Sequence, residues 1–267
     1  CKEISYKGVV NLVTDADRES QILISNLIQG QFPGYDILGE EELRKELCEI
    51  GRRMDSKGYV AATDGNLSVR LSGERFLFTP SNSCLGTLEP DDLVLTDVHG
   101  DPVDETRNVT SEHRLHLAVY SEREDVDAIV HAHPPYSLAA TIAGLSLARP
   151  VLPEVVHNLG SIPTTPYATP SSPDGAKMIR DYVRVHDAIV IERHGTVTVG
   201  NTPEEAYLKL EKVEHAAQVN FLASQLGIRS LLPEEEVEKL ARAGIEAGLN
   251  PEAVPAGRTQ RGAAEGD

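Results

Sequence analysis

Two apolar segments with the same opening, Asp-Ala-Ile-Val, constrain this chain more than any other feature. The first covers 127–130 and leads into His131 and His133, whereas the second covers 187–190 and is followed by Ile-Glu-Arg and His194. Side chains alternate between the two faces of a strand, so His131 and His133 point the same way from one backbone segment. Three neutral imidazole nitrogens around one open position are a common catalytic zinc arrangement. The repeated pattern therefore predicts that His131, His133 and His194 hold a metal ion.

A His-x-His pair has a simpler explanation when it stands alone, because such pairs also occur by chance or as half-buried strand residues. Here a third histidine, His194, stands at the matching place after the second strand and is followed by Gly195. This third histidine favours the metal site over the simpler explanation.

Length and charge limit the class of the protein and its partners. The 267 residues allow one large domain, or one with an appendage, and no stretch approaches the roughly 18 apolar residues of a membrane span. A net charge of −17 spread along the chain argues against nucleic acid or an anionic membrane as a partner. Cys1, Cys48 and Cys84 are an odd number without ligand-like spacing, so they imply no disulfide framework. A cytoplasmic location fits best, and no charged and apolar leader suggests export.

Hydrophobic periodicity and turn residues predict the order of the elements. A helical pattern from Glu41 ends at Gly58, and two β-rich segments at 64–71 and 75–80 predict an antiparallel pair. The segment 250–267 is rich in Gly, Ala, Pro and charge, and we expect it to be disordered. Further strands are expected at 92–97, 126–132, 187–193 and 196–199, and further helices at 112–120, 135–143, 203–226 and 233–244.

Six motifs between about 42 and 228 resemble the class II aldolase/adducin family, the zinc-dependent group that contains L-fuculose-phosphate aldolase. The resemblance implies an α/β domain of three layers, with a central, mainly antiparallel sheet flanked by helices. It also implies a homotetramer with sites at subunit interfaces. In chain order the motifs are Asp-Gly-Asn-Leu-Ser-Val-Arg, Phe-Thr-Pro-Ser-Asn, Thr-Ser-Glu followed by His116, His-Ala-His-Pro, Ile-Pro-Thr-Thr-Pro-Tyr-Ala-Thr-Pro and Arg-His-Gly-Thr-Val-Thr-Val-Gly.

The resemblance also assigns roles to residues of this chain. It implies that His131, His133 and His194 hold one zinc ion per chain and that Glu112 is the catalytic acid/base. Zinc as a Lewis acid can stabilise the enediolate left when a carbon–carbon bond of a ketose breaks. Backbone N–H groups at turns and at a helix N-terminus can hold a phosphate without a basic side chain. The residues that fall where the family binds substrate phosphate are Gly65, Asn66, Ser81, Asn82, Thr110 and Ser111.

Three departures from the family pattern leave alternatives open. Asn82 stands where the family usually has glycine, although asparagine tolerates left-handed backbone angles. Asn-Val-Thr-Ser-Glu replaces the commoner Lys-Pro-Ser-Ser-Glu ahead of Glu112. Glu154 lies near the place of a catalytic tyrosine in fuculose-phosphate aldolase, and a glutamate there is similar to methylthioribulose-phosphate dehydratase, where it is an acid/base. A strand-end or loop carboxylate explains Glu154 equally well.

The resemblance implies that the chain cleaves a small phosphorylated ketose reversibly into dihydroxyacetone phosphate and an aldehyde. A dehydratase acting on a methylthioribulose-phosphate type of substrate is the nearest enzymatic alternative, because of Glu154. A metal-free, adducin-like interaction module is the alternative from another class, and the intact set of three histidines argues against it. A 4-epimerase is less favoured, because the resembling epimerases carry aspartate at the position of Glu112.

Residues 1–40 resemble the first stretch of the inositol monophosphatase family, from Val-Thr-Asp-Ala-Asp to Gly-Glu-Glu. That family also needs an Asp-Pro-Ile-Asp-Gly-Thr type of loop, which the chain lacks. We therefore interpret Glu40 and Glu41 as solvated acids at a helix start rather than as metal ligands. The expected division is an N-terminal fragment at 1–40, the aldolase/adducin domain at 41–228, and a C-terminal helix with its tail at 229–267.

Overall fold

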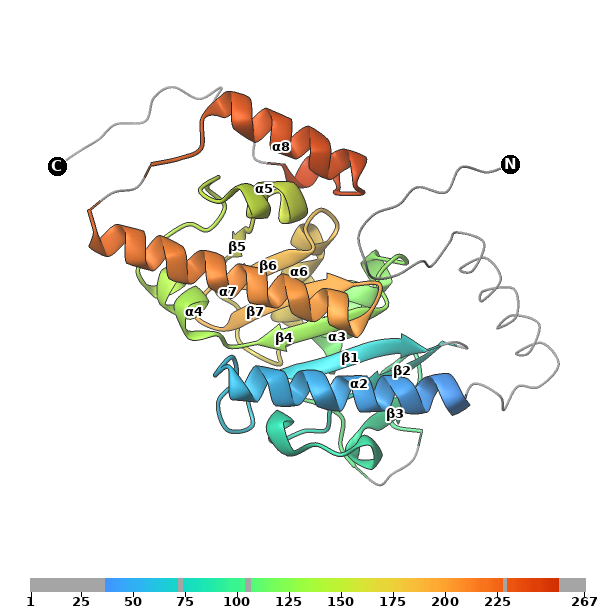
Figure 1. The fold of residues 1–267 in the computed structure, drawn as a ribbon. Coiled ribbons are helices and arrows are strands. Elements are labelled where there is room, and N and C mark those ends of the chain that lie inside the picture. Colours follow the sequence, from blue (N-terminus) through green and yellow to red (C-terminus); the bar gives the residue numbers. More distant parts are fainter. Residues whose placement is uncertain (1–36, 72–73, 104–106, 228–229, 255–267) are drawn as a thin grey trace, which may run out of the picture. The chain divides into compact units, whose positions relative to one another are not determined.

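A seven-stranded sheet forms the centre of the fold (Figure 1). The computed structural model describes residues 37–71, 74–103, 107–227 and 230–254. The strand order is β3-β2-β1-β4-β7-β6-β5, and every pair of neighbours is antiparallel except β5 and β6. The expected mainly antiparallel sheet is confirmed. The strands are β1 (Asn66–Leu71), β2 (Arg75–Phe78), β3 (Val94–Thr96), β4 (Ala128–Ala132), β5 (Thr164–Thr165), β6 (Ala188–Ile191) and β7 (Gly195–Gly200).

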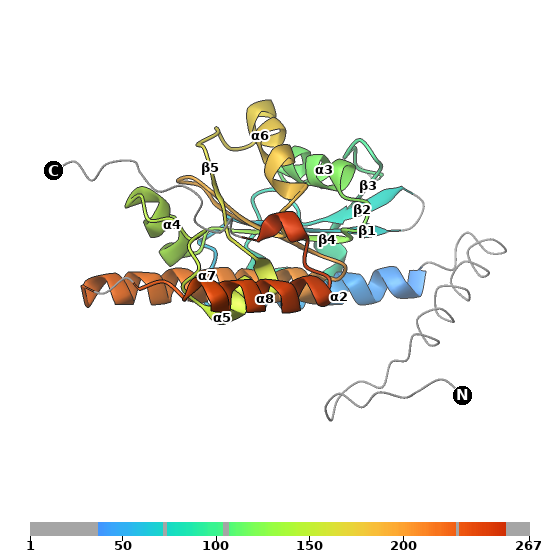
Figure 2. The same ribbon diagram turned by 90° about the horizontal axis from the view of Figure 1, so that it is seen from above.

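Helices cover both faces of the sheet, which gives the expected three layers (Figure 2). One face carries α3 and α6, and the other carries α2, α5, α7 and α8, while α4 packs against α7. No helix in the described ranges is long and apolar enough to cross a membrane. The helices are α2 (Ile37–Ser56), α3 (His113–Glu122), α4 (Pro135–Ile142), α5 (Pro153–Leu159), α6 (Pro173–Val183), α7 (Pro203–Gln225) and α8 (Glu234–Glu246).

The alternation of side chains along β4 determines where His131 points. Ala128 and Val130 belong to the core between the sheet and α2 and α7, whereas Ile129 belongs to the core under α3 and α6. Because side chains two apart share a face, His131 lies on the same side as Ile129. The strand therefore directs this histidine toward the layer that contains α3.

The structure contains two helices, α5 and α6, that hydrophobic periodicity does not predict. Each has a proline in its first turn, and the Ser172 side chain at the N-cap of α6 accepts a hydrogen bond from the Gly175 N–H. These helices have 7 and 11 residues, too short to be stable alone. Their stability comes from packing of α5 on α8 and of α6 on α3, which sequence periodicity cannot reveal.

The two ends of the described chain also differ from expectation. Helix α2 begins at Ile37 rather than at Glu41, and it includes Glu40 in its first turn. The expectation of a disordered tail is wrong for 250–254, because Pro251–Ala253 form a 3₁₀ turn and Ala253 is buried. Residues 255–267 of that tail and the phosphatase-like residues 1–36 lie outside the described residues.

Candidate metal centre

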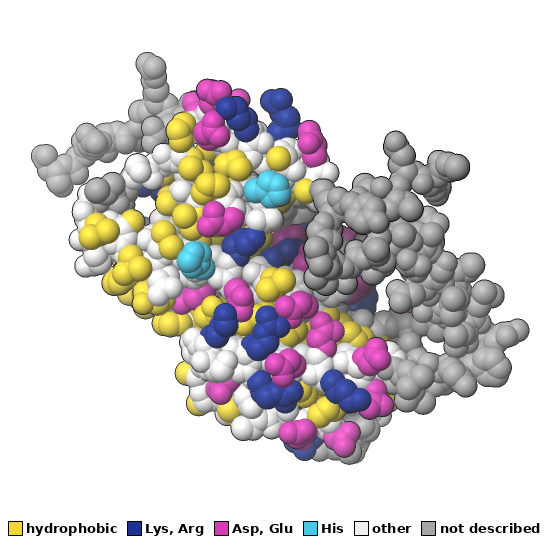
Figure 3. Space-filling model, in the orientation of Figure 1, with side chains coloured by type: hydrophobic (Ala, Val, Ile, Leu, Met, Phe, Trp, Pro, Cys, Tyr) yellow, Lys and Arg dark blue, Asp and Glu magenta, His cyan; other side chains and the backbone are white. Residues whose placement is uncertain are grey.

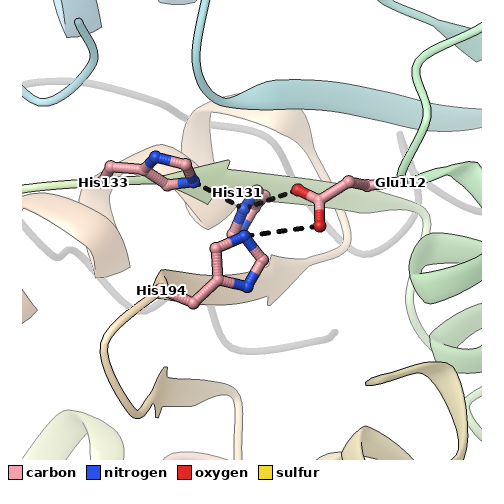
Figure 4. Close-up of side chains that lie close together, drawn as sticks. All are labelled: Glu112, His131, His133 and His194. Atoms are coloured by element: carbon pink, nitrogen blue, oxygen red, sulfur yellow. Dashed lines mark hydrogen bonds and ion pairs between the residues drawn. The ribbon is translucent and has the colours of Figure 1, made fainter. Parts of the chain in front are cut away.

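Four side chains meet at the C-terminal end of β4 (Figure 4). Glu112, His131, His133 and His194 each offer a ligand atom, and these atoms all lie within 4.8 Å of one another. The centroids of the three imidazole rings are 4.8 to 5.1 Å apart. The structure thus brings together the three histidines and the glutamate that the sequence motifs single out.

Each of these residues stands where an element begins or ends. His131 lies in β4, and His133 follows the last residue of that strand. His194 lies in the turn between β6 and β7, and Glu112 is the N-cap residue of α3. A Cβ atom on Gly195 would lie 2.3 Å from the Ala132 carbonyl oxygen. Only glycine therefore lets β7 approach β4 closely enough for His194 to reach the other histidines.

Hydrogen bonds orient the ring of His131. Its Nδ1 lies 2.9 Å from the Thr196 carbonyl oxygen, which can only accept, so Nδ1 carries a proton and donates a hydrogen bond to that oxygen. Its Nε2 faces the centre of the cluster, 2.8 Å from Glu112 Oε2 and 3.1 Å from Nε2 of His133. In the ring of His133, Nδ1 faces away from the cluster and lies 3.5 Å from Asp64 Oδ2. Two of the rings thus present Nε2 inward while Nδ1 faces an oxygen outside the cluster.

Burial and mutual charge set the protonation of the cluster. Burial, together with the charge of His131, lowers the pKa of His133 to about 4 and that of His194 to about 3. Burial alone would raise the pKa of Glu112, but the charge and hydrogen bond of His131 outweigh it and hold that pKa below its usual value. His133 and His194 are therefore neutral at neutral pH, and Glu112 is ionised.

The donor set fits a divalent metal such as zinc. Neutral imidazole nitrogens are its preferred nitrogen ligands, and His133 and His194 are neutral here, whereas Glu112 outweighs burial and raises the pKa of His131, so a metal would displace a proton from Nε2 of His131. Glu112 Oε1 is buried without a hydrogen-bond partner, although His194 Nε2 lies 3.4 Å away. An unpaired buried carboxylate oxygen is costly unless a cation or a substrate proton meets it. The cluster therefore suits a site at which both a metal and a substrate bind.

The segments proposed to bind phosphate lie side by side. The Leu67 N–H donates to Thr79 Oγ1, which places the start of β1 beside the end of β2. The Ser81 N–H donates to the Asn108 carbonyl at 2.9 Å, and the Thr110 N–H donates to the Thr79 carbonyl at 3.2 Å. These bonds gather the two residues before Leu67, the turn at 81–82 and the residues before α3. They are Gly65, Asn66, Ser81, Asn82, Thr110 and Ser111.

The six phosphate candidates differ in how free their side chains are. Asn82 is exposed and adopts a φ of 56°, in the left-handed region that asparagine tolerates. Ser111 is exposed, and its hydroxyl accepts a hydrogen bond from Ser171. Thr110 is buried, and its hydroxyl accepts from the Glu112 N–H at 3.4 Å. The side chain of Asn66 is buried and already paired, and Asn66 also pairs with His131 across β1 and β4, so its side chain is not free for a phosphate.

Glu154 is not brought into the cluster within this chain. It is an exposed residue in the first turn of α5, rather than at a strand end or in a loop. It lines a groove against α7 together with Leu208, Lys212 and His215. A catalytic role for Glu154 therefore requires that it reach the cluster of another subunit.

Sequence reasoning missed three features around the site. Asp64 contacts His133, and its place in the quoted motif Asp-Gly-Asn-Leu-Ser-Val-Arg could have indicated a role at the site. Thr196 contributes only its backbone carbonyl to His131, and no sequence pattern marks such a contact. Ser172 belongs to the loop 168–172, whose first three residues end the quoted motif Ile-Pro-Thr-Thr-Pro-Tyr-Ala-Thr-Pro, and this loop together with Arg114 lines a cavity beside Glu112 and His194. This loop comes from a distant part of the chain, and only the packing of α6 on α3 places it there.

Comparisons with known proteins agree with the geometry. Residues 45–221 match the family model described as Class II Aldolase and Adducin N-terminal domain. The chain is 32% identical over 202 residues to 5-deoxy-D-ribulose 1-phosphate aldolase of Bacillus thuringiensis serovar kurstaki, covering 74% of this chain and 93% of that protein. It is 31% identical over 203 residues to 3-oxo-tetronate 4-phosphate decarboxylase of Escherichia coli, covering 74% and 95%. The solved structure of L-fuculose-1-phosphate aldolase from Thermus thermophilus is similar with a TM-score of 0.62 and 30% identity, covering 71% of this chain and 98% of that one.

Proposed function

Because the chain belongs to the class II aldolase and adducin family, we propose that it is a zinc-dependent aldolase that cleaves a small phosphorylated ketose reversibly into dihydroxyacetone phosphate and an aldehyde. One observation carries this proposal: a buried glutamate lies among three histidines that converge on one point. An adducin-like interaction module has no need of such a cluster.

The residues of this chain divide the chemistry between them. A zinc ion held by His131, His133 and His194 would supply Lewis-acid stabilisation of negative charge on the substrate's carbonyl and hydroxyl oxygens. Glu112 moves the proton. In the direction of synthesis, Glu112 takes a proton from the carbon next to the carbonyl of dihydroxyacetone phosphate. In the direction of cleavage, the hydroxyl beside the breaking bond loses its proton as its carbon becomes the aldehyde, the bond's electron pair moves onto the ketone unit, and Glu112 in its protonated form adds a proton to that carbon. One proton leaves and one is added, so the reaction has no net proton change.

The two oxygens of Glu112 are not equivalent in this step. Oε2 lies 2.8 Å from His131 Nε2 and accepts a hydrogen bond from Asn66, whereas Oε1 has no hydrogen-bond partner. Oε1 is therefore the oxygen available to a substrate proton. A small cavity lined by Glu112 and His194 adjoins this carboxylate.

The proposed phosphate site lies next to this base. Asn82 in the turn after β2 and Ser111 before α3 are exposed, and the two segments carry polar, uncharged residues rather than cationic side chains. A helix N-terminus with free N–H groups attracts an anion. This arrangement suits a phosphorylated substrate in a chain whose net charge is −17.

Assembly into a cytoplasmic homotetramer is part of the same proposal. Exposed apolar side chains gather at α4 and over the C-terminal half of α7, at the left of the view in Figure 3. They are Ile142, Phe221, Leu222 and Leu226, with exposed fractions of 39 to 79%. An apolar patch of this kind is typical of a subunit interface. A neighbouring subunit would also be the route by which Glu154 reaches a site.

A decarboxylase is a second candidate, and the comparisons support it. The decarboxylase relative matches this chain about as well as the aldolase relative, with 31% and 32% identity. Loss of carbon dioxide from a 3-oxo-tetronate 4-phosphate leaves dihydroxyacetone phosphate, and so does loss of an aldehyde from a ketose 1-phosphate. Both reactions leave the broken bond's electron pair on the same three-carbon unit, so the same cluster and base serve either. The dehydratase alternative depends on Glu154.

Product analysis separates these candidates. The zinc-loaded protein is incubated with ketose 1-phosphates, 3-oxo-tetronate 4-phosphate and methylthioribulose phosphate, and products are identified by mass spectrometry. We expect dihydroxyacetone phosphate together with an aldehyde. Carbon dioxide as the second product would make the chain a decarboxylase, and a dehydrated product of unchanged carbon number would make it a dehydratase. Absence of turnover on the whole panel would contradict the proposal.

A further inference from the structure

A continuous chain of polar side chains runs from Glu112 into the interior between β1 and α3. Two members, Asn66 and Ser68, lie on β1, and two others, His116 and Tyr120, lie on α3. Their exposed fractions range from 0 to 5%. Buried polar groups of this kind are hydrogen-bonded in folded proteins, so their partners show what this row of side chains supports.

The spacing of these residues explains why they interleave. Residues two apart on a strand share a face, so Asn66 and Ser68 both point toward α3. Residues four apart on a helix share a stripe, so Glu112, His116 and Tyr120 follow one another along the side of α3 that faces β1. The two rows therefore alternate in space, from Glu112 at the cluster to Tyr120 in the core.

Each neighbouring pair in this chain is within hydrogen-bond distance. Asn66 Nδ2 lies 3.3 Å from Glu112 Oε2, and Asn66 Oδ1 lies 2.6 Å from His116 Nε2. His116 Nδ1 lies 2.7 Å from Ser68 Oγ, which in turn lies 2.7 Å from the Tyr120 hydroxyl. The two shortest contacts to the histidine thus use both of its ring nitrogens.

Elementary hydrogen-bond rules give every link a direction. The carboxylate of Glu112 only accepts, so the Asn66 amide donates to it and turns its carbonyl oxygen toward His116. That oxygen only accepts, so His116 carries its proton on Nε2. Burial lowers the pKa of His116 to about 3, so the ring is neutral and Nδ1 accepts from the Ser68 hydroxyl. Ser68 then accepts from Tyr120, and all donors point toward Glu112.

We propose that this chain positions the base, with His116 as the residue that fixes which way the Asn66 amide faces. The inference rests on the proposed role of Glu112. An amide has nearly the same shape when its nitrogen and oxygen exchange places, so packing alone does not select an orientation. Ionised Glu112 and the Nε2–H of His116 both require the Asn66 oxygen on the histidine side, and only His116 keeps this requirement while Glu112 carries a proton. The amide N–H then holds Glu112 Oε2 and leaves Oε1 for the proton.

The two amide substitutions of His116 give a matched test. The Gln side chain places its amide nitrogen near the position of Nε2, so His116→Gln can still donate to Asn66. The Asn side chain is shorter and reaches only the position of Nδ1, so His116→Asn keeps the link to Ser68 and loses the link to Asn66. Both substitutions remove the imidazole, and they differ in the one contact that the inference requires.

The readouts are zinc content, kcat, KM, and exchange of a dihydroxyacetone-phosphate proton with deuterated water. For His116→Asn we expect exchange and kcat to fall by about 10²-fold, as for a misplaced catalytic group, with KM and zinc content near those of the parent. For His116→Gln we expect exchange and kcat to stay close to those of the parent. Equal rates in the two variants would overturn the inference, because a purely structural histidine does not distinguish them. Absence of exchange in the parent would overturn the proposed function itself.

Nitrogen NMR on the unsubstituted protein tests the same chain without activity and without relying on the stability of a variant. Long-range proton–nitrogen correlations show which ring nitrogen of a histidine carries the proton. We expect His116 as the neutral form protonated on Nε2. Protonation on Nδ1 would put two acceptors, the ring nitrogen and the Asn66 oxygen, face to face and would overturn the inference.

Discussion

Replacing Gly195 by alanine should damage the metal centre more specifically than it damages the fold. A Cβ atom there would lie 2.3 Å from the Ala132 carbonyl oxygen, 2.7 Å from His133 Cδ2 and 3.1 Å from His131 Cε1. Ordinary contacts between such atoms begin near 3.5 Å, so the carbonyl would have to move by about 1 Å. Its movement shifts the backbone between His131 and His133.

Two magnitudes follow for Gly195→Ala. Overpacking of this kind costs about 1–3 kcal/mol in the free energy of unfolding. Disturbing groups that orient metal ligands typically costs about 10–100-fold in metal affinity. Urea denaturation measures the first quantity, and competition with a chromophoric chelator measures the second.

The same strand supplies a matched control at its other end. A Cβ atom on Gly200 would lie 2.8 Å from the Ala206 nitrogen and 3.0 Å from Glu205 Cβ, far along β7 from the histidines. We expect Gly200→Ala to lose stability in a similar range and to keep the parental zinc affinity. If Gly195→Ala bound zinc as tightly as Gly200→Ala, the close approach of β7 to β4 would not be what assembles the site.

Three further outcomes are expected. His133→Ala removes one of three ligands, so elemental analysis should show that this variant has lost most of its zinc. Substitution of the exposed His215 by alanine is the control and should leave the zinc content unchanged. A full zinc complement in His133→Ala would contradict the site. Glu214→Ala should lower the free energy of unfolding by about 1–3 kcal/mol in urea, because the buried carboxylate accepts from the N–H groups of Tyr136 and Ser137, and an unchanged midpoint would count against that role. His116 is neutral in the fold with a pKa of about 3, so the unfolded chain takes up its proton first as the pH falls below about 6.5. Stability should therefore fall toward acid by about 1.4 kcal/mol per pH unit more in the parent than in His116→Gln, and parallel curves would refute this.

The metal cluster shows how much of a site can be predicted from strand ends. The repeated Asp-Ala-Ile-Val segments form β4 and β6, as expected, and each leads to a histidine of the cluster. The two strands are not neighbours, however, because β7 lies between them. His194 reaches the cluster from the tight turn between β6 and β7, and Gly195 allows the close approach. Strand order depends on long-range pairing, which the local pattern does not contain.

Asn66 shows where sequence reasoning stops. Its place in the motif predicts a phosphate contact, but its side chain bonds to Glu112 and His116, which are 46 and 50 positions away in sequence. The residues of this hydrogen-bonded row lie two apart along β1 and four apart along α3, and both spacings can be read from the sequence. That β1 and α3 face each other is a fact of tertiary packing, so the spacing acquires meaning only in the fold.

The most direct test of the central claim is proton exchange in Glu112→Gln. This variant keeps the shape of the side chain and removes the proton acceptor, while the three histidines remain. The measurement is exchange of a dihydroxyacetone-phosphate proton with deuterated water by zinc-loaded protein, with zinc content and thermal stability checked alongside. We expect exchange to fall by about 10²–10⁴-fold at parental zinc content. Exchange at the parental rate would show that another group moves the proton and would remove Glu112 from the mechanism.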